Sequence, residues 1–158
     1  NAPAQFWTTD VPLYVENGAT SMVVLPSDTF KISCTVAFGE TALDTQFYSL
    51  EVTPENFEKE LGPCRTFVAY RDLAQLIAAG LAKGGSLDNA VILHDGAIIS
   101  NDGLRFPNEL VRHKIMDMVG DLYLTGKRVR AHVIAIKPGH STNVQLAKLM
   151  LARETAQK

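Results

Sequence analysis

The chain has 158 residues, 46% of them hydrophobic, and a formal net charge of −2 with acidic and basic side chains interspersed. This length indicates one domain of ordinary size, with enough apolar side chains for a core. The balanced charge argues against the basic surface of a nucleic-acid-binding protein. Without a run of about 18 apolar residues, the chain is also expected to have no transmembrane segment.

The chain opens on "NAPAQFW", which does not begin with methionine and does not resemble a signal peptide. We therefore expect a processed or excised piece of a longer protein. Cys34 and Cys64 lie in hydrophobic surroundings, and neither belongs to a CxxC motif. The expected interpretation is buried free thiols in a reducing, cytoplasmic compartment, and a disulfide is left open as the alternative.

The first part of the chain is predicted to consist mainly of strands. "VPLYVENGATSMVVLPS", residues 11–27, indicates two strands around the hairpin signal Asn17-Gly18. "FKISCTVAF", residues 30–38, alternates and is rich in β-forming residues. "TQFYSLEV", residues 45–52, is a further candidate strand.

A short helix is expected in "TPENFEKEL", residues 53–61. Thr53 suits the N-cap and Pro54 suits the first helical position. Asn56 stands where a capping box would have Glu or Gln, so the start signal is incomplete. "CRTFVAY", residues 64–70, is typical of a strand at a sheet edge.

A second helix is predicted in "RDLAQLIAAGLAKGG", residues 71–85, where Gly84 and Gly85 are expected to stop it. Four of its residues fall on one face: Leu73, Leu76, Ile77 and Gly80. "NAVILHDG", residues 89–96, predicts a short buried strand that ends in a turn.

The remaining elements are a helix over 107–124, a strand over 128–137 and a helix over 141–157. Together with the earlier strands, this order predicts an α+β fold. We expect a two-layer α/β sandwich in which a mixed β-sheet packs on helices.

The helix over 107–124 carries the first chemical signal. Pro107 suits its first position, and Glu109 places a negative charge in its first turn. An apolar stripe follows at helical spacing: Val111, Ile115, Met118 and Leu122. A second stripe, well off the first, consists of His113, Asp117 and Asp121. His113 and Asp117, at i and i+4, can converge on one ion, and both are good zinc ligands. The alternative is a helix with a mixed solvated face.

His140 lies where a strand ends and a helix begins, directly after Gly139. Alone it would be a residue at the start of a helix that faces water. If the two helices lie side by side, Asp121 could hydrogen-bond His140 and fix its tautomer, beside a metal held by the first helix. His94 and His132 are interpreted as structural.

The motifs "RHKIMDMVGDLYL" and "IKPGH" resemble the zinc-dependent UDP-3-O-acyl-N-acetylglucosamine deacetylases of lipid A biosynthesis in Gram-negative bacteria. The resemblance is closest over residues 61–152, which include the upstream segment "CRTF". It implies that His113 and Asp117 are two of three zinc ligands. The third ligand is a histidine in the family's N-terminal domain, close to the glutamate that acts as general base. This chain would then be the second, C-terminal domain alone, over residues 1–158.

The same resemblance implies the remaining roles. His140 would stabilise the oxyanion and protonate the leaving amine, with Asp121 as its hydrogen-bonding partner. Lys114, Thr66 and Phe67 would contact the substrate. A βαβ insert over about 66–93, which includes the segment from Tyr70 to Val91, would form the passage for the substrate's acyl chain.

One segment departs from the family pattern: "VAFGETAL" stands where the family often has a histidine-proline turn. The implied partners are an acylated UDP-amino sugar and the N-terminal domain of the same protein. Two other functions remain open. One is a non-catalytic standalone domain that binds an acylated nucleotide sugar or a partner, and the other is a metal hydrolase of a different amide.

Overall fold

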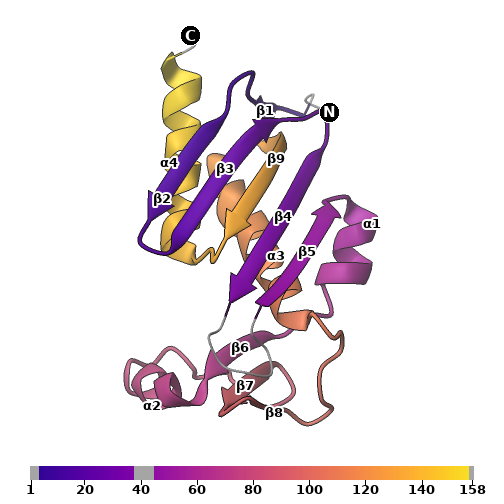
Figure 1. The fold of residues 1–158 in the computed structure, drawn as a ribbon, viewed down its shortest axis with the longest axis vertical. Coiled ribbons are helices and arrows are strands. Elements are labelled where there is room, and N and C mark those ends of the chain that lie inside the picture. The colour runs from indigo at the N-terminus through magenta and orange to yellow at the C-terminus, as the bar shows by residue number, and fades with distance from the viewer. Residues whose placement is uncertain (1–3, 38–44, 157–158) are drawn as a thin grey trace.

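The computed structural model describes residues 4–37 and 45–156, in an arrangement that Figure 1 shows from the open face of its main sheet. Residues 38–44 are outside the described part, and with them the end of the strand expected over 30–38 and most of "VAFGETAL". The elements are β1 (Phe6–Thr8), β2 (Leu13–Asn17), β3 (Thr20–Pro26), β4 (Phe30–Ala37), β5 (Thr45–Glu51), α1 (Pro54–Asn56), a π-helical turn (Phe57–Leu61), β6 (Thr66–Ala69), α2 (Tyr70–Ala78), β7 (Ala90–His94), β8 (Ala97–Ile99), α3 (Glu109–Leu122), a 3-10 turn (Tyr123–Thr125), β9 (Arg128–Ile136) and α4 (His140–Ala156).

The main sheet is mixed, as expected. Its strand order is β2-β3-β9-β4-β5, and β1 pairs with the beginning of β9. β9 is parallel to β4 and antiparallel to β3. Helices α3 and α4 lie behind this sheet in Figure 1 and cover one of its faces. The fold is therefore the α+β two-layer sandwich predicted from the order of elements.

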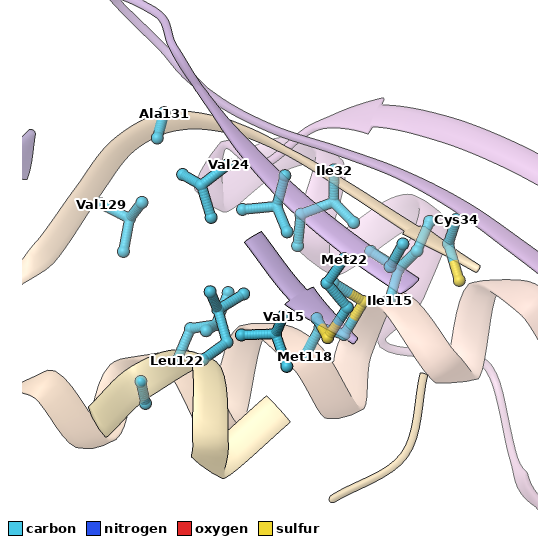
Figure 2. Close-up of a cluster of buried hydrophobic side chains, with 14 of the residues drawn as sticks. Val15, Met22, Val24, Ile32, Cys34, Ile115, Met118, Leu122, Val129 and Ala131 are labelled. Atoms are coloured by element: carbon cyan, nitrogen blue, oxygen red, sulfur yellow. The ribbon is translucent and has the colours of Figure 1, made fainter. Parts of the chain in front are cut away.

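The core lies between this face and the two helices. Alternate residues of β4 and β9 are buried there, among them Ile32 and Val133. The predicted apolar stripe of α3 meets them, and all four of its residues are 0% exposed: Val111, Ile115, Met118 and Leu122. Figure 2 shows three of these beneath the sheet residues. Burial of each such side chain contributes about 1.5–3 kcal/mol relative to exposure, so the stripe fixes which flank of α3 faces outward.

Two of the predicted local signals are present. The β2–β3 hairpin turns at Gly18, whose φ of +59° lies in the left-handed region that glycine adopts without strain. The Thr53 side chain accepts a hydrogen bond from the Asn56 backbone N–H at 3.1 Å, which caps α1. Strand β1 was not predicted; the Trp7 indole N–H ties it to α4 by donating to the Met150 carbonyl at 2.9 Å.

The helix expected over 71–85 is shorter than predicted. α2 ends at Ala78, because Gly80 takes a φ of +70° and closes the helix. The Gly80 N–H bonds to the Ile77 carbonyl, and the Leu81 N–H bonds to the Leu76 carbonyl. This pair of bonds is a Schellman cap, in which glycine is favoured. Gly80 therefore ends the helix, ahead of the glycines at 84 and 85, and does not belong to its apolar face.

The helix expected from Pro107 begins two residues later, at Glu109. The Glu109 carboxylate turns back and accepts the backbone N–H of Arg105 at 2.6 Å, which holds residues 105–108 in a turn instead of a helix. Near the observed start of the helix, the Val111 backbone N–H donates a hydrogen bond to the side-chain oxygen of Gln46 in β5 at 3.2 Å. Pro107 therefore lies outside the helix.

A separate small sheet holds the region of the expected insert. β6 and β7 are parallel with α2 between them, which is the expected βαβ unit, and β6 is at the edge of the sheet. The third strand, β8, was not predicted, and it pairs antiparallel to β7. Asp95 and Gly96, with φ of 47° and 75°, form the two-residue turn between them. The Asp-Gly pair was the available signal for this hairpin.

One buried ion pair joins this small sheet to α3. Arg65, immediately before β6, contacts Glu109 through Nε at 2.9 Å and Nη2 at 3.0 Å. The Arg65 backbone N–H donates to the same carboxylate at 2.9 Å. Glu109 is 0% exposed and Arg65 is 4% exposed. Burial alone would raise the pKa of Glu109, but hydrogen bonds from Arg65 and from the Arg105 backbone hold it below its ordinary value.

Among the described residues, no helix has the length and apolar character needed to cross a membrane.

We predict that Glu109→Gln lowers the free energy of unfolding by about 3–5 kcal/mol, because the Arg65 charge would stay buried without its partner. The sign of the pH effect follows from the lowered pKa of Glu109. Its ionised form stabilises the fold above the unfolded-state pKa, and this contribution is lost as pH falls through the folded-state pKa. The variant should therefore lose less stability on acidification than the parent.

Denaturant unfolding between about pH 3 and pH 7 measures both effects. Glu55→Gln is the matched control, since Glu55 forms an exposed ion pair with Lys59 at 2.8 Å that should contribute about 1 kcal/mol at most. Equal stability losses in the two variants would contradict the prediction.

Candidate functional site

The two predicted metal ligands lie side by side on the outer flank of α3. His113 is 9% exposed, and its Nε2 is 3.3 Å from Oδ1 of Asp117, one helical turn later. The core stripe faces the opposite way, so the helix presents these two side chains at its boundary with the small sheet. The i, i+4 spacing has placed them together as expected.

The surroundings of His113 decide which ring nitrogen is free. Its Nδ1 is 3.3 Å from the Cys64 carbonyl, which can only accept a hydrogen bond, so the ring proton belongs on Nδ1. The lone pair then remains on Nε2, toward Asp117. Burial lowers the pKa of His113, although the Asp117 charge opposes this shift. A neutral imidazole oriented by a backbone carbonyl is the form that binds metal ions.

Asp117 is shared between several neighbours. While Oδ1 faces His113, Oδ2 accepts a hydrogen bond from Lys114 Nζ at 2.8 Å. His140 approaches the same oxygen with Nε2 at 4.0 Å. The carboxylate therefore lies between a cation and two imidazoles.

Phe67 of β6 closes one side of this cluster. Its ring centroid is 6.2 Å from that of His113, in an edge-to-face arrangement, and Lys114 Nζ lies 5.2 Å from the ring centroid. Thr66 precedes Phe67 in the same strand and is exposed. Of the two residues from "CRTF", Phe67 is thus the one that the structure brings against His113 and Lys114.

The hydrogen bond expected between Asp121 and His140 is present. His140 is the first residue of α4, and its Nδ1 is 2.8 Å from Asp121 Oδ2. His140 is 69% exposed in its side chain, whereas Asp121 is 17% exposed. The bond places the ring proton on Nδ1, because an ionised carboxylate accepts only. Nε2 is then directed toward the side of the cluster where Asp117 lies.

Asp121 has a second partner, which was not predicted. Asn143, 1% exposed, donates from Nδ2 to Asp121 Oδ2 at 2.8 Å. Its Oδ1 is buried and has no hydrogen-bond partner among the described residues, an arrangement that costs about 1–3 kcal/mol. The signal for this residue was its place three positions after His140, on the same face of α4.

The donor set fits a tetrahedral metal ion in chemistry and spacing. Tetrahedral zinc with bonds of about 2.0–2.2 Å holds two donors roughly 3.4 Å apart, and His113 Nε2 is 3.3 Å from Asp117 Oδ1. Catalytic zinc usually has three protein ligands. Within residues 4–37 and 45–156, no group of three His, Cys, Asp or Glu side chains is placed to hold a metal.

An apolar groove of about 680 Å³ is lined by Thr66 and Phe67 and adjoins the cluster through Phe67. Three residues of α2 line it, Leu73, Leu76 and Ile77, and they face β6 and β7 across it. Ile77 is 62% exposed. These are the side chains that the sequence analysis placed on one face of the helix.

The remaining histidines and the thiols of the two cysteines are not among the proposed ligands. His132 Nε2 is 2.8 Å from Ser33 Oγ on the open face of the main sheet, and the His94 ring is 4.5 Å from the Tyr70 ring. Cys34 and Cys64 are free and buried. Burial raises the pKa of the Cys34 thiol to about 12 and that of Cys64 to about 11.

Comparison with known proteins defines the family. Residues 1–152 match the family described as LpxC, UDP-3-O-acyl N-acetylglycosamine deacetylase. The chain belongs to this family, as its motifs predicted.

Individual relatives carry the same description. The chain is 44% identical over 141 residues to the UDP-3-O-acyl-N-acetylglucosamine deacetylase of Chlamydia felis (strain Fe/C-56). This matched region covers 89% of the chain and 50% of the Chlamydia felis protein. It is 45% identical to the proteins of the same name from Chlamydia muridarum and Chlamydia trachomatis serovar L2, covering 89% of the chain and 49% of each. The chain thus spans about half the length of the curated relatives it matches.

Proposed function

We propose that this chain supplies one half of the active site of a zinc-dependent deacetylase. The reaction is hydrolysis of the N-acetyl group of UDP-3-O-acyl-N-acetylglucosamine in lipid A biosynthesis. The observation that carries the proposal is the meeting of two ordered pairs, His113 with Asp117 and His140 with Asp121. His140 Nε2 lies 4.0 Å from Asp117, so one pair faces the other.

His113 and Asp117 hold the zinc ion in this proposal. The ion supplies Lewis acidity, which polarises the acetamide carbonyl and makes a water molecule more acidic. The Cys64 carbonyl keeps Nε2 of His113 available, and Lys114 holds the other oxygen of Asp117. Neutral imidazole and carboxylate are both ligands that zinc accepts.

His140 acts on the leaving group. As the water oxygen bonds to the acetyl carbon, the C–N bond breaks. His140 acts as the doubly protonated imidazolium: its Nε2 gives a proton to the leaving nitrogen, while its Nδ1 keeps the proton that Asp121 accepts. The products are acetate and a free amine on the sugar. Asp121 holds Nδ1 of His140, so that Nε2 is the nitrogen that reaches the substrate.

The substrate's acyl chain occupies the groove between α2 and the small sheet. An apolar groove of about 680 Å³ is large enough for part of an alkyl chain. Phe67 lies where the groove meets the cluster, Thr66 lines the groove beside it, and Lys114 presents a cation near the Phe67 ring. We therefore assign substrate contacts to Lys114, Thr66 and Phe67.

The other half of the site comes from the N-terminal domain of the same protein. That domain contributes the third zinc ligand and the glutamate that takes the proton from water. The half-length coverage of the relatives supports this division, since the matched deacetylases are about twice as long as the region they share with this chain.

We predict that the isolated chain releases no acetate from UDP-3-O-acyl-N-acetylglucosamine and that the complete protein does, because the general base and third ligand come from elsewhere. Mass spectrometry of the sugar product measures turnover. The complete protein with His113→Ala is the control for metal-dependent activity. A complete protein that binds the sugar without turnover would favour the non-catalytic binding function, and turnover by the isolated chain would show that the site is complete within it.

We further predict that the isolated chain binds Zn²⁺ weakly, because two protein ligands replace the usual three. Calorimetric titration of the chain should show weak heat that His113→Ala abolishes. His94→Ala is the matched control, since it removes a histidine from the small sheet and leaves the cluster intact. Tight stoichiometric binding that survives His113→Ala would place the metal site elsewhere.

In the complete protein, His140→Ala should reduce kcat by roughly 10²–10⁴-fold, the effect of a positioned acid–base group, with little change in KM. Asp121→Asn should reduce kcat less, because His140 itself remains. Steady-state kinetics of the two variants, with His94→Ala as control, measures the difference. Near-full activity of His140→Ala would mean that this histidine only begins α4.

A further inference from the structure

Asn143 makes a specific contact that the proposed reaction has not used. Its side-chain amide is buried in the first turn of α4 and donates to Asp121 Oδ2 at 2.8 Å. His140 Nδ1 lies 2.8 Å from that same oxygen. One carboxylate oxygen of α3 thus joins two side chains that stand three positions apart on α4.

The orientation of the Asn143 amide follows from this contact. A carboxylate only accepts hydrogen bonds, so the NH₂ group must face Asp121 and the amide oxygen must face away. That oxygen is buried and has no partner among the described residues. Buried polar atoms are rarely left unpaired. An apolar side chain would fill this position without leaving a buried amide oxygen unpaired, so packing alone does not explain an asparagine here. Its NH₂ group, which is hydrogen-bonded, is the group that holds Asp121.

The exposure of His140 explains why such support is needed. Its side chain is 69% exposed, so few packed neighbours restrict the ring. Its orientation then depends on Asp121, whose carboxylate can rotate about its own bonds. The second hydrogen bond, from Asn143, restricts that rotation. Both donor side chains, His140 and Asn143, are attached to the first turn of α4, so their positions relative to each other are fixed by the helix.

We infer that Asn143 is a positioning residue of the proposed deacetylase: it fixes Asp121, and Asp121 in turn orients His140 toward the reacting amide. Asn143 itself does not touch the substrate. The inference rests on the function proposed for His140 and adds a third member to the Asp121–His140 pair.

The kinetic test uses the complete zinc-loaded protein. Asn143→Leu keeps the approximate volume but removes the donor. It should lower kcat by roughly 10- to 10²-fold with KM unchanged, since a 1 Å misplacement of a reacting group can cost about 10²-fold. In the His140→Ala background the same substitution should have no further effect on kcat, because the group it positions is gone. An equal fall in both backgrounds would mean a merely structural role and overturn the inference.

Two more variants separate positioning from folding. Asn143→Ala removes the amide without adding apolar bulk, and serves if Asn143→Leu does not fold. Trp7→Phe removes a different hydrogen bond to α4, the one to the Met150 carbonyl, and should leave kcat unchanged. A loss of kcat in Trp7→Phe equal to that in the Asn143 variants would assign their effect to general loosening of α4.

A spectroscopic test does not depend on turnover. With ¹⁵N-labelled histidine, the ring Nδ1 proton of His140 should give a downfield signal in the complete protein, because Asp121 protects it from exchange. The signal should broaden or vanish in Asn143→Ala while the backbone spectrum is unchanged. If the complete protein shows this behaviour but no deacetylation, the proposed function fails and the positioning role stands. A signal that persists unchanged in Asn143→Ala, or is absent from the parent, overturns the inference.

Discussion

Glu109 holds a negative charge in the interior, and the arrangement of the site depends on how that charge is satisfied. Its carboxylate accepts hydrogen bonds from the Arg65 side chain, from the Arg65 backbone N–H and from the Arg105 backbone N–H. These contacts join the chain before β6 to the first turn of α3. Because Phe67 lies two residues after Arg65, and His113 one turn after Glu109, the ion pair sets the distance between the groove and the cluster. A buried ion pair is a weak source of net stability, and its value here is geometric.

The second junction is at the other end of α3, where the carboxylate of Asp121 meets the first turn of α4. Donors from α4 approach a helix-terminal carboxylate there, and a negative charge near a helix N-terminus is favourable. His140 and Asn143 supply those donors. α3 is thus fixed to the small sheet at one end and to α4 at the other, and His113 and Asp117 lie between the two junctions.

Periodicity and motif spacing predicted much of this architecture. The stripe from Val111 to Leu122 identified the buried face of α3, and the i, i+4 spacing correctly placed His113 beside Asp117, the two proposed ligands. The errors lie where a tertiary contact outweighed a local preference. Pro107 is a good helix start, yet the Glu109 carboxylate holds the residues before it in a turn. The Cys64 carbonyl could not be assigned, because it is a backbone group 49 residues from His113 in sequence. Asn143 was missed, although its place three positions after His140 was an available signal.

The division of α3 into a core stripe and a flank that carries the proposed ligands also explains how an exposed side chain such as His140 is held in position. His140 has few neighbours of its own, whereas Ile115 and Met118, on the core side of α3, are fully buried. A close-packed interior leaves such a helix little freedom to roll. Any rotation of α3 about its axis would expose the stripe and move His113, Asp117 and Asp121 together. Burial of the stripe therefore also fixes the positions of these three side chains. The hydrogen bonds of Glu109 and Asp121, near the two ends of α3, fix Phe67 and His140 relative to them.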